Sequence, residues 1–135
     1  DKSFNMCPQE LKKRITKKTK LIIPVPMLGN PCDMKAIRKI AKSKNVPILE
    51  DACESFGAKY KNSYLGNQCD ITVFSLDFAK TITTGEGGLI VTNKKKLYKF
   101  CKEFVDHGHE KSLVHSSHMM LARCLFSSHY AIPWL

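Results

Sequence analysis

The sequence of 135 residues predicts an α/β domain with a mostly parallel sheet. Short apolar runs that are typical of strands alternate with longer stretches whose apolar residues recur at helical spacing. The hydrophobic fraction of 43% and the charged fraction of 25% are those of an ordinary globular protein. Because chemistry in such sheets gathers at the carboxyl ends of the strands, we expect the functional residues there.

The first half of the chain carries two helical and two strand-like patterns. In chain order they are a basic helix-like segment at 9–16, a strand at 21–25, a helix at 33–43 and a strand at 46–49. Asp33 stands where the second helix needs an N-cap. The apolar residues on one face of this helix are Met34, Ile37, Ile40 and Ala41. The second strand ends at two acids, Glu50 and Asp51, so carboxylates are expected at a strand end.

The second half predicts a helix-like stretch after Asp51, then two strands and a final helix. The strands are 71–76 and 89–92, and the helix is 94–105. We expect four residues of this helix to face inward: Leu97, Phe100, Cys101 and Phe104. The carboxyl ends of the predicted strands then offer three candidate sites, at 24–27, 50–54 and 75–80.

The net charge of +10 raises the question of nucleic-acid binding. Most of the basic residues fall in three clusters on predicted helices: Lys12, Lys13, Arg14, Lys17, Lys18 and Lys20; Lys35, Arg38, Lys39, Lys42 and Lys44; and Lys94, Lys95 and Lys96. No arginine-rich tract or ladder of aromatic residues accompanies them, as single-strand binders would show. The interpretation as solvated helix faces is therefore preferred to nucleic-acid binding.

The cysteine pattern argues against a metal site. Six cysteines are spread along the chain without a C-x-x-C pair, which favours free thiols in a reducing cytosol, and His115 and His118 have no ligand partners close in sequence. No apolar run approaches the roughly 20 residues that span a bilayer. We therefore expect a cytoplasmic protein that binds neither metal nor membrane. The first residue is Asp1 rather than methionine, which favours a processed or partial chain.

A single lysine, Lys80, stands between an apolar run and the tract TITTGEGG. A lysine at a strand end beside Phe78 and Ala79 can be partly desolvated, which exposes a nucleophilic amine that can add to a carbonyl group. The alternative is an ordinary surface lysine. A carboxylate at 50–51 can hold a heteroaromatic nitrogen protonated. The alternative interpretation of these acids is a helix N-cap. The GEGG turn alone is a weak sign of phosphate binding.

Linked motifs give a more specific indication. They are EDACESFGA (50–58), FSLDFAK (74–80), TTGEGGLIVTN (83–93) and DHG (106–108), preceded by IIPVPMLGNPCDMKAI (22–37). In this order they resemble the DegT/DnrJ/StrS family of pyridoxal-phosphate-dependent sugar aminotransferases. The resemblance spans roughly residues 9 to 110. It implies a partial large domain of fold type I, a three-layer α-β-α architecture, at 1–110, with a divergent or truncated tail at 111–135.

The resemblance also implies roles for individual residues. Lys80 would hold the cofactor, pyridoxal 5′-phosphate, covalently and then move the proton at the reacting carbon. Asp51 would pair with the pyridine nitrogen, and Ser75 would donate a hydrogen bond to the cofactor phosphate. Glu54 stands where the family often has glutamine or histidine near the cofactor ring, and a carboxylate there would repel a phenolate unless it is neutralised.

The function implied is transfer of an amino group from glutamate or glutamine to a keto-sugar nucleotide, in amino-sugar and polysaccharide biosynthesis. The full-length form would be a homodimer, and this chain by itself an inactive or weakly active fragment. Three alternatives stay open: a related sugar dehydratase, amino transfer to a non-nucleotide carbonyl, and a catalytically silent remnant with a sensor or assembly role. Some relatives that dehydrate have histidine in place of the lysine, so Lys80 favours amino transfer.

Overall fold

The computed structural model of the chain describes residues 3–105. The predictions that concern the DHG motif at 106–108, the pair His115 and His118, and the tail at 111–135 lie outside these residues. The chain divides into two units, Asp1–Lys95 and Lys96–Leu135, and each is considered by itself.

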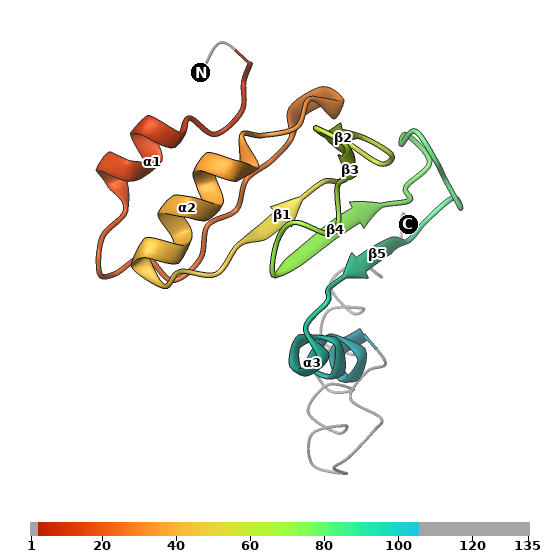
Figure 1. Cartoon of the computed structure of the whole chain (residues 1–135). Helices are drawn as coiled ribbons and strands as arrows, with labels where there is room; N and C mark the ends of the chain where they lie inside the picture. The colour runs from red at the N-terminus through yellow and green to blue at the C-terminus, as the bar shows by residue number, and fades with distance from the viewer. Residues whose placement is uncertain (1–2, 106–135) are drawn as a thin grey trace, which may run out of the picture. The chain divides into compact units, whose positions relative to one another are not determined.

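The main sheet of the first unit has three strands in the order β1-β4-β5, which lie side by side in Figure 1. They are β1 (Leu49–Asp51), β4 (Ile71–Ser75) and β5 (Gly88–Val91). β1 and β4 are parallel, whereas β5 returns antiparallel to β4. The sheet is thus mixed rather than mostly parallel, because a single loop joins β4 to β5 without the crossover that parallel pairing requires.

The strand expected at 21–25 forms only in part. Ile22 makes an isolated parallel bridge with Ile48, and the backbone continues beside β1 because the Asp51 N–H donates to the Pro24 carbonyl over 3.0 Å. Pro24 and Pro26 have no N–H to donate, so this segment cannot complete a ladder. It still extends the sheet along the edge of β1 that β4 leaves free.

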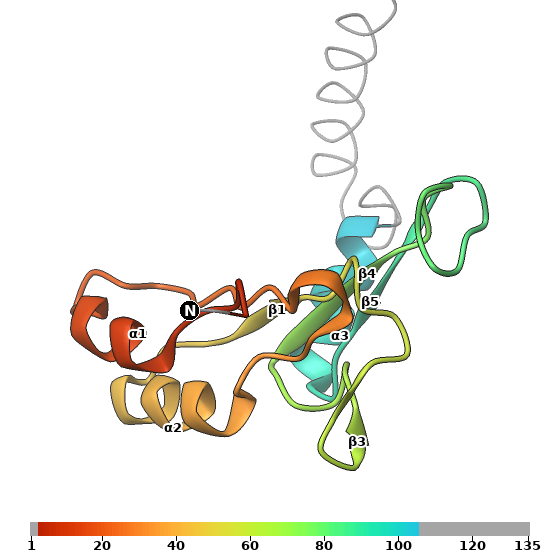
Figure 2. The same ribbon diagram turned by 90° about the horizontal axis from the view of Figure 1, so that it is seen from above.

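Two helices pack beside each other next to these strands: α1 (Pro8–Arg14) and α2 (Met34–Lys44). The N-cap of α2 is Asp33, as predicted, since its Oδ1 accepts a hydrogen bond from the Ala36 N–H over 3.2 Å. The buried residues of the core beneath the helices are Ile15, Ile22, Cys32, Met34, Ile37, Ala41 and Ile48. Figure 2 shows α2 to one side of β1, where this core holds it.

The prediction of a helix-like stretch between Asp51 and Ile71 is wrong. The segment instead forms turns and a small hairpin of β2 (Lys59–Tyr60) and β3 (Ser63–Tyr64). Gly57, Lys61 and Gly66 have positive φ angles, which no α-helix accommodates. A short 3₁₀ turn, η1 (Met27–Gly29), also escaped prediction.

The last described helix, α3 (Lys95–Val105), agrees with the predicted 94–105. The expectation that its aromatic residues face inward fails in the structure, where Phe100 is 64% and Phe104 60% exposed. Their rings stack on each other with centroids 6.3 Å apart. Within residues 3–105, no helix is long and apolar enough to span a bilayer.

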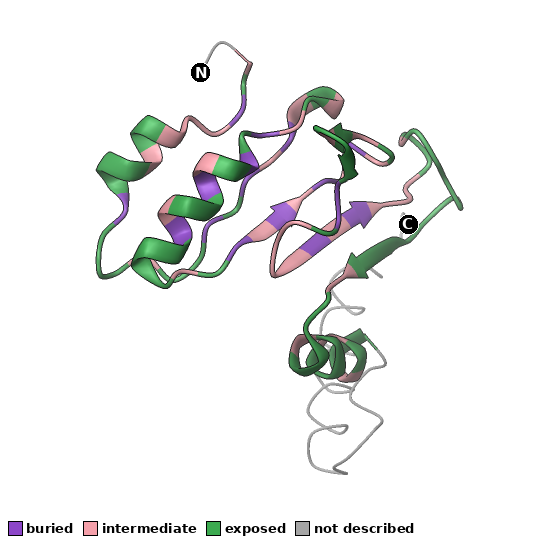
Figure 3. Cartoon of the chain, in the orientation of Figure 1, coloured by how far each residue is buried: buried purple, intermediate pink, exposed green. Residues whose placement is uncertain are grey.

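Burial alternates along the strands, so the sheet has two different faces (Figure 3). Glu50, Thr72 and Phe74 are buried, whereas Asp51 and Ser75 are only half-buried. Glu50 is fully buried, and its Oε2 accepts a hydrogen bond from the Thr72 hydroxyl over 3.2 Å. Its Oε1 makes no hydrogen bond of normal geometry within the described residues. Burial therefore raises the pKa of Glu50, against smaller opposing effects of Thr72, Gly66 and Cys69.

This buried acid makes stability depend on pH in a defined direction. Because the folded-state pKa of Glu50 is raised, its contribution to stability is complete below its ordinary pKa of 4.5 and is lost as the pH rises through the folded value. We expect Glu50→Gln to remove this loss, so the free energy of unfolding of the variant rises relative to the parent between about pH 5 and about pH 8. Urea unfolding at both pH values measures this. Glu86→Gln, at an exposed acid, serves as the control, and an equal pH trend in both variants would contradict the prediction.

Candidate active site

Three segments that follow strands meet at one edge of the sheet. The Ala52 N–H donates to the Val73 carbonyl over 2.9 Å, which keeps the chain after β1 beside β4. The Ser55 hydroxyl donates to the Pro26 carbonyl, which ties the segment after β1 to the one after Pro24. The predicted sites at 24–27, 50–54 and 75–80 therefore share one region, the carboxyl ends of β1 and β4.

The strand register places Asp51 and Ser75 on the same face of the sheet. Asp51 lies opposite Val73, and Ser75 follows two residues later on β4. Since side chains alternate along a strand, Asp51, Val73 and Ser75 point to one side, and Glu50 points to the other. Of the two neighbouring acids, only Asp51 is thus available at the half-open face.

Lys80 lies in the loop that joins β4 to β5. The loop is closed at its base because the Leu76 N–H donates to the Gly87 carbonyl over 2.9 Å and the Thr84 N–H donates to the Leu76 carbonyl over 3.0 Å. Thr83 reinforces this closure, since its hydroxyl donates to the Leu76 carbonyl over 3.1 Å and accepts from the Gly85 N–H over 2.9 Å. The threonines of the TITTGEGG tract therefore shape the loop.

A compact turn connects Ser75 to Lys80. The Ser75 Oγ accepts from the Asp77 N–H over 3.3 Å, and the Asp77 carbonyl accepts from the Lys80 N–H over 3.0 Å. Asp77 also accepts, through Oδ1, from the Ala79 N–H over 3.1 Å. Lys80 is half-buried. Phe78 is 77% exposed, so the phenyl ring does not provide the apolar cover of the Lys80 amine that was expected from the sequence. The bond that Ser75 accepts leaves its own hydroxyl hydrogen to donate elsewhere.

Cys53 lies among the charged groups of this region. Its N–H donates to Asp51 Oδ1 over 3.2 Å. Burial, followed by a hydrogen bond to Asp51 and the charge of that carboxylate, raises the pKa of the Cys53 thiol to about 11, while the charge of Lys80 acts in the opposite direction. The exposed Glu54 adds a further raising effect. Asp51, Glu54 and Lys80 thus all act on one thiol, which stays protonated at neutral pH, and the sequence offered no signal for Cys53 beyond its position near Asp51.

Gly88 allows β5 to approach the end of β4. It pairs with Ser75, and a Cβ atom at this position would lie 2.9 Å from the Phe74 carbonyl oxygen. Real Cβ atoms do not approach backbone oxygens so closely, so the glycine is a steric requirement here. The second glycine of the GG pair therefore serves strand pairing beside the candidate site.

The sequence profile of the DegT/DnrJ/EryC1/StrS aminotransferase family matches residues 1–125. The chain belongs to this family. The match reaches beyond residue 110, and the boundary predicted there stays a prediction.

Individual family members cover most of this chain. GDP-perosamine synthase of Escherichia coli O157:H7 is 46% identical over 108 residues, which are 80% of this chain and 30% of that protein. The structure of Helicobacter pylori PseC, an aminotransferase involved in the biosynthesis of pseudoaminic acid, matches with a TM-score of 0.79 and 32% identity over 84% of this chain and 31% of that one. The Escherichia coli GDP-4-keto-6-deoxy-D-mannose-3-dehydratase with bound hydrated PLP matches with a TM-score of 0.69 and 36% identity, over 74% and 26%.

These family members confirm the predicted fold, a partial α/β domain of the fold-type-I transferases, with the sheet mixed in the described part. The chain spans about 30% of the length of the GDP-perosamine synthase that it matches. The predicted site residues of the present chain all lie in the described part of its first unit. They are Lys80, Asp51, Ser75 and Glu54.

The hydroxyl of Thr83 provides a test of how the loop positions Lys80. Thr83→Val removes both hydrogen bonds at nearly constant volume, so we expect local opening of the loop to become about 1 kcal/mol easier. This corresponds to roughly fivefold faster hydrogen exchange at the amides of Thr84 and Gly85. Thr81→Val, elsewhere on the exposed loop, is the control. Equal exchange rates in the two variants would show that Thr83 does not hold the loop.

Proposed function

We propose that this chain provides the lysine, ring-binding acid and phosphate-binding serine of a pyridoxal-phosphate-dependent aminotransferase that acts on a keto-sugar nucleotide. The observation that carries the proposal is the arrangement of Asp51 and Ser75 on one sheet face, with the loop of Lys80 following directly from Ser75. An aromatic cofactor with a basic nitrogen at one end and a phosphate at the other needs such spaced partners.

The residues present fit this cofactor. The Asp51 carboxylate faces the half-open side of the sheet, where it can accept a hydrogen bond from a protonated ring nitrogen. The Ser75 hydroxyl has a hydrogen left to donate to a phosphate oxygen. Lys80 is the nearby amine, and the Cys53 thiol does not compete as a nucleophile because its pKa is raised to about 11.

Pyridoxal 5′-phosphate, when bound, supplies an aldehyde that carries the amino group and a ring that accepts electrons. Lys80 Nζ would bind the aldehyde carbon with loss of water, and its amine, once released, would move a proton between that carbon and the substrate carbon that bears the amino group. Asp51 would keep the ring nitrogen protonated, and Ser75 would orient the phosphate. We assign Glu54 to the surroundings of the ring, where its charge would disfavour a neighbouring oxyanion.

The substrate class rests on the relatives, which include a GDP-perosamine synthase and an aminotransferase of pseudoaminic acid biosynthesis. We infer a keto-sugar nucleotide as amino acceptor, glutamate or glutamine as donor, and a homodimeric full-length enzyme in the cytoplasm. Because the chain spans about 30% of such a relative, the isolated chain is expected to turn over little or no substrate. The rest of the site then comes from sequence outside this chain.

A sugar dehydratase is the second candidate function. It is favoured by 36% identity to the Escherichia coli dehydratase structure. Lys80 weighs against a dehydratase, since the family resemblance implies histidine at this position in some relatives that dehydrate. Product analysis with a GDP-linked keto-sugar separates amino transfer from dehydration, and absence of both products in the full-length protein would support a silent remnant.

Covalent trapping tests the role of Lys80. The chain is incubated with pyridoxal 5′-phosphate and reduced with borohydride, and the modified lysines are located by peptide mass spectrometry. We expect preferential labelling of Lys80, whose label disappears in Lys80→Ala but persists in Lys44→Ala, because Lys80, in contrast to Lys44, follows the proposed ring and phosphate partners Asp51 and Ser75 at the carboxyl ends of the strands. Labelling spread evenly over the lysines would contradict the proposal.

The two neighbouring acids offer a matched comparison. Asp51→Asn removes a charge-assisted hydrogen bond worth about 1.5–3 kcal/mol, so we expect the cofactor concentration for half-maximal labelling of Lys80 to rise at least about tenfold. Glu50→Gln, one residue away but on the buried face, should leave it nearly unchanged. An equal effect of both substitutions would show that the face of the sheet does not decide cofactor binding.

A further inference from the structure

A cavity of about 1030 Å³ lies at the opposite end of the strands from Lys80. Its wall includes Ile48 and Asp70, which directly precede β1 and β4. β4 has five residues, so the two ends of the strand are about 15 Å apart at roughly 3.3 Å per residue. The cavity is therefore distinct from the candidate active site at the carboxyl ends.

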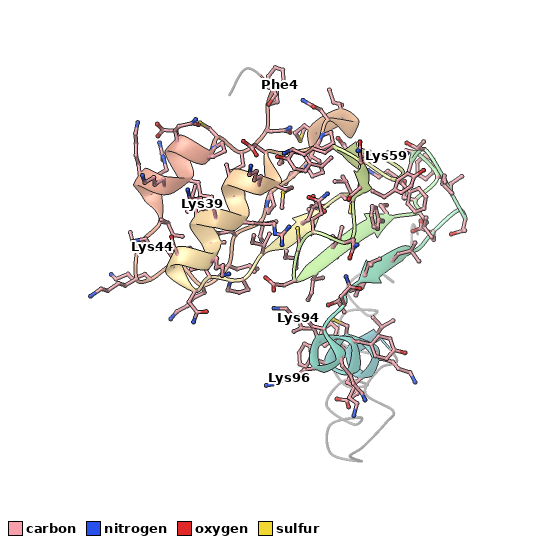
Figure 4. The ribbon with its side chains drawn as sticks, in the orientation of Figure 1. Phe4, Lys39, Lys44, Lys59, Lys94 and Lys96 are labelled. Carbon is pink, nitrogen blue, oxygen red and sulfur yellow. The ribbon has the colours of Figure 1, made fainter. Side chains whose placement is uncertain are left out.

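Six basic side chains line this cavity: Lys35, Arg38, Lys39, Lys42, Lys61 and Lys94. Figure 4 labels Lys39 on α2 and Lys94 after β5. The lining contains a single carboxylate, Asp70, which is already engaged. Its Oδ2 accepts from the Ile48 N–H over 2.7 Å, and its Oδ1 pairs with Lys94. Burial acts to raise the pKa of Asp70, but these hydrogen bonds and the nearby cations outweigh it and lower the pKa.

The remaining five cations are exposed and form no ion pair within residues 3–105, although the charge of Arg38 acts on Asp70 and that of Lys61 acts on Asp33. The ion pairs in this part of the chain join Glu10 to Lys13 and to Arg14, and Asp70 to Lys94. α1 thus pairs two of its three basic residues with an acid of its own. The positive charge of the cavity is not neutralised in this way.

Four of the five basic residues of α2 are spaced at intervals that place them on one face of the helix. Lys35, Arg38, Lys39 and Lys42 stand at positions i, i+3, i+4 and i+7, and α2 contains no acid. Like-charge pairs at this spacing destabilise a helix. The helix therefore carries an electrostatic cost that an anion in the cavity would relieve.

The rest of the cavity wall is suited to a small ligand. Its apolar part is formed by Ala41, Val46, Pro47 and Ile48. Tyr60 adds an aromatic wall that is held in place, since its hydroxyl donates to Asp33 Oδ1 over 2.8 Å. Asn67 and Gln68 contribute amide groups. The volume is near the upper end of the usual range for small-molecule sites, about 300–1,000 Å³, and a concave site favours a compact ligand over an extended duplex.

We propose that this cavity binds an oligophosphate, a ligand with two or more linked phosphate groups, either free or as part of a nucleotide. Several phosphate charges match the unneutralised cations of α2, and Arg38 can bind phosphate oxygens bidentately. In a nucleotide, the base would lie against Tyr60 and the amides. The site is independent of the function proposed for Lys80.

Calorimetric titration of the whole chain with inorganic triphosphate tests this proposal. The variant Lys35→Ala/Arg38→Ala/Lys42→Ala removes three cavity cations but keeps α2 in good helix formers. The matched control Lys12→Ala/Lys17→Ala/Lys18→Ala removes the same charge outside the cavity. We expect the dissociation constant to rise at least about tenfold in the cavity variant and less than about twofold in the control. Equal losses in both variants, or no measurable binding to the parent chain, would overturn the proposal.

A second measurement uses the unaltered chain and so does not depend on the folding of a variant. Bound triphosphate should slow acetylation of Lys35, Lys39 and Lys42 more than that of Lys12 and Lys17, as quantified by peptide mass spectrometry. Uniform protection of these lysines would overturn the proposed site.

Replacing triphosphate by GDP distinguishes a nucleotide from a free oligophosphate as the ligand. Tighter binding of GDP than of pyrophosphate indicates a nucleotide, and equal binding indicates a free oligophosphate. A DNA duplex that binds more tightly than triphosphate, with steep salt dependence and equal loss in both variants, would replace the proposal by nucleic-acid binding.

Discussion

The parallel register of β1 and β4 is the constraint on which the candidate site depends. With Asp51 opposite Val73, the alternation of side chains sends Glu50 into the core and leaves Asp51 and Ser75 on the other face. A slip of one residue would exchange the two acids. The buried hydrogen bond between Thr72 and Glu50 supports the observed register, because an acid in the core needs its partner there. A contact on one face of the sheet thus positions the candidate site residues on the other.

The antiparallel return of β5 has a similar role for Lys80. The loop between β4 and β5 is held at its base by Leu76 and Gly87, and Gly88 allows the two backbones to approach where Ser75 ends its strand. The hydroxyl of Thr83 occupies the inside of the loop. Small and hydroxyl-bearing residues in this tract are therefore required first by the backbone, and any space that they leave for a ligand is a consequence.

The two ends of the strands differ in how their charges are compensated. At the carboxyl ends, the charges of Asp51 and Glu54 raise the pKa of the Cys53 thiol, and the charge of Lys80 opposes them. At the amino ends, one engaged acid, Asp70, faces six cations. The high net charge of the chain is thus concentrated in part on a single concave surface rather than spread evenly over helix faces. The basic residues of α2 are exposed, as predicted for a solvated helix face, but four of them gather at one cavity.

The sequence by itself determined the local elements of this protein. The helix at 33–43 and its cap at Asp33 follow from contacts within four residues, and the strands at 71–76 and 89–92 follow from short apolar runs; all of these were confirmed. The motifs around Lys80 identified the family.

Predictions failed where local signals were weak or opposed. Between Asp51 and Ile71, positive φ angles interrupt the chain, and at 21–25 proline removes the donors of a ladder. Only the tertiary structure decided which face of the sheet Glu50 and Asp51 take. It also decided that Asp51 and Lys80 have opposite effects on the pKa of Cys53, and that four cations of α2 share a cavity with Lys61 and Lys94. These features join residues far apart in the chain, and their pairing depends on strand register and packing, which local periodicity does not encode.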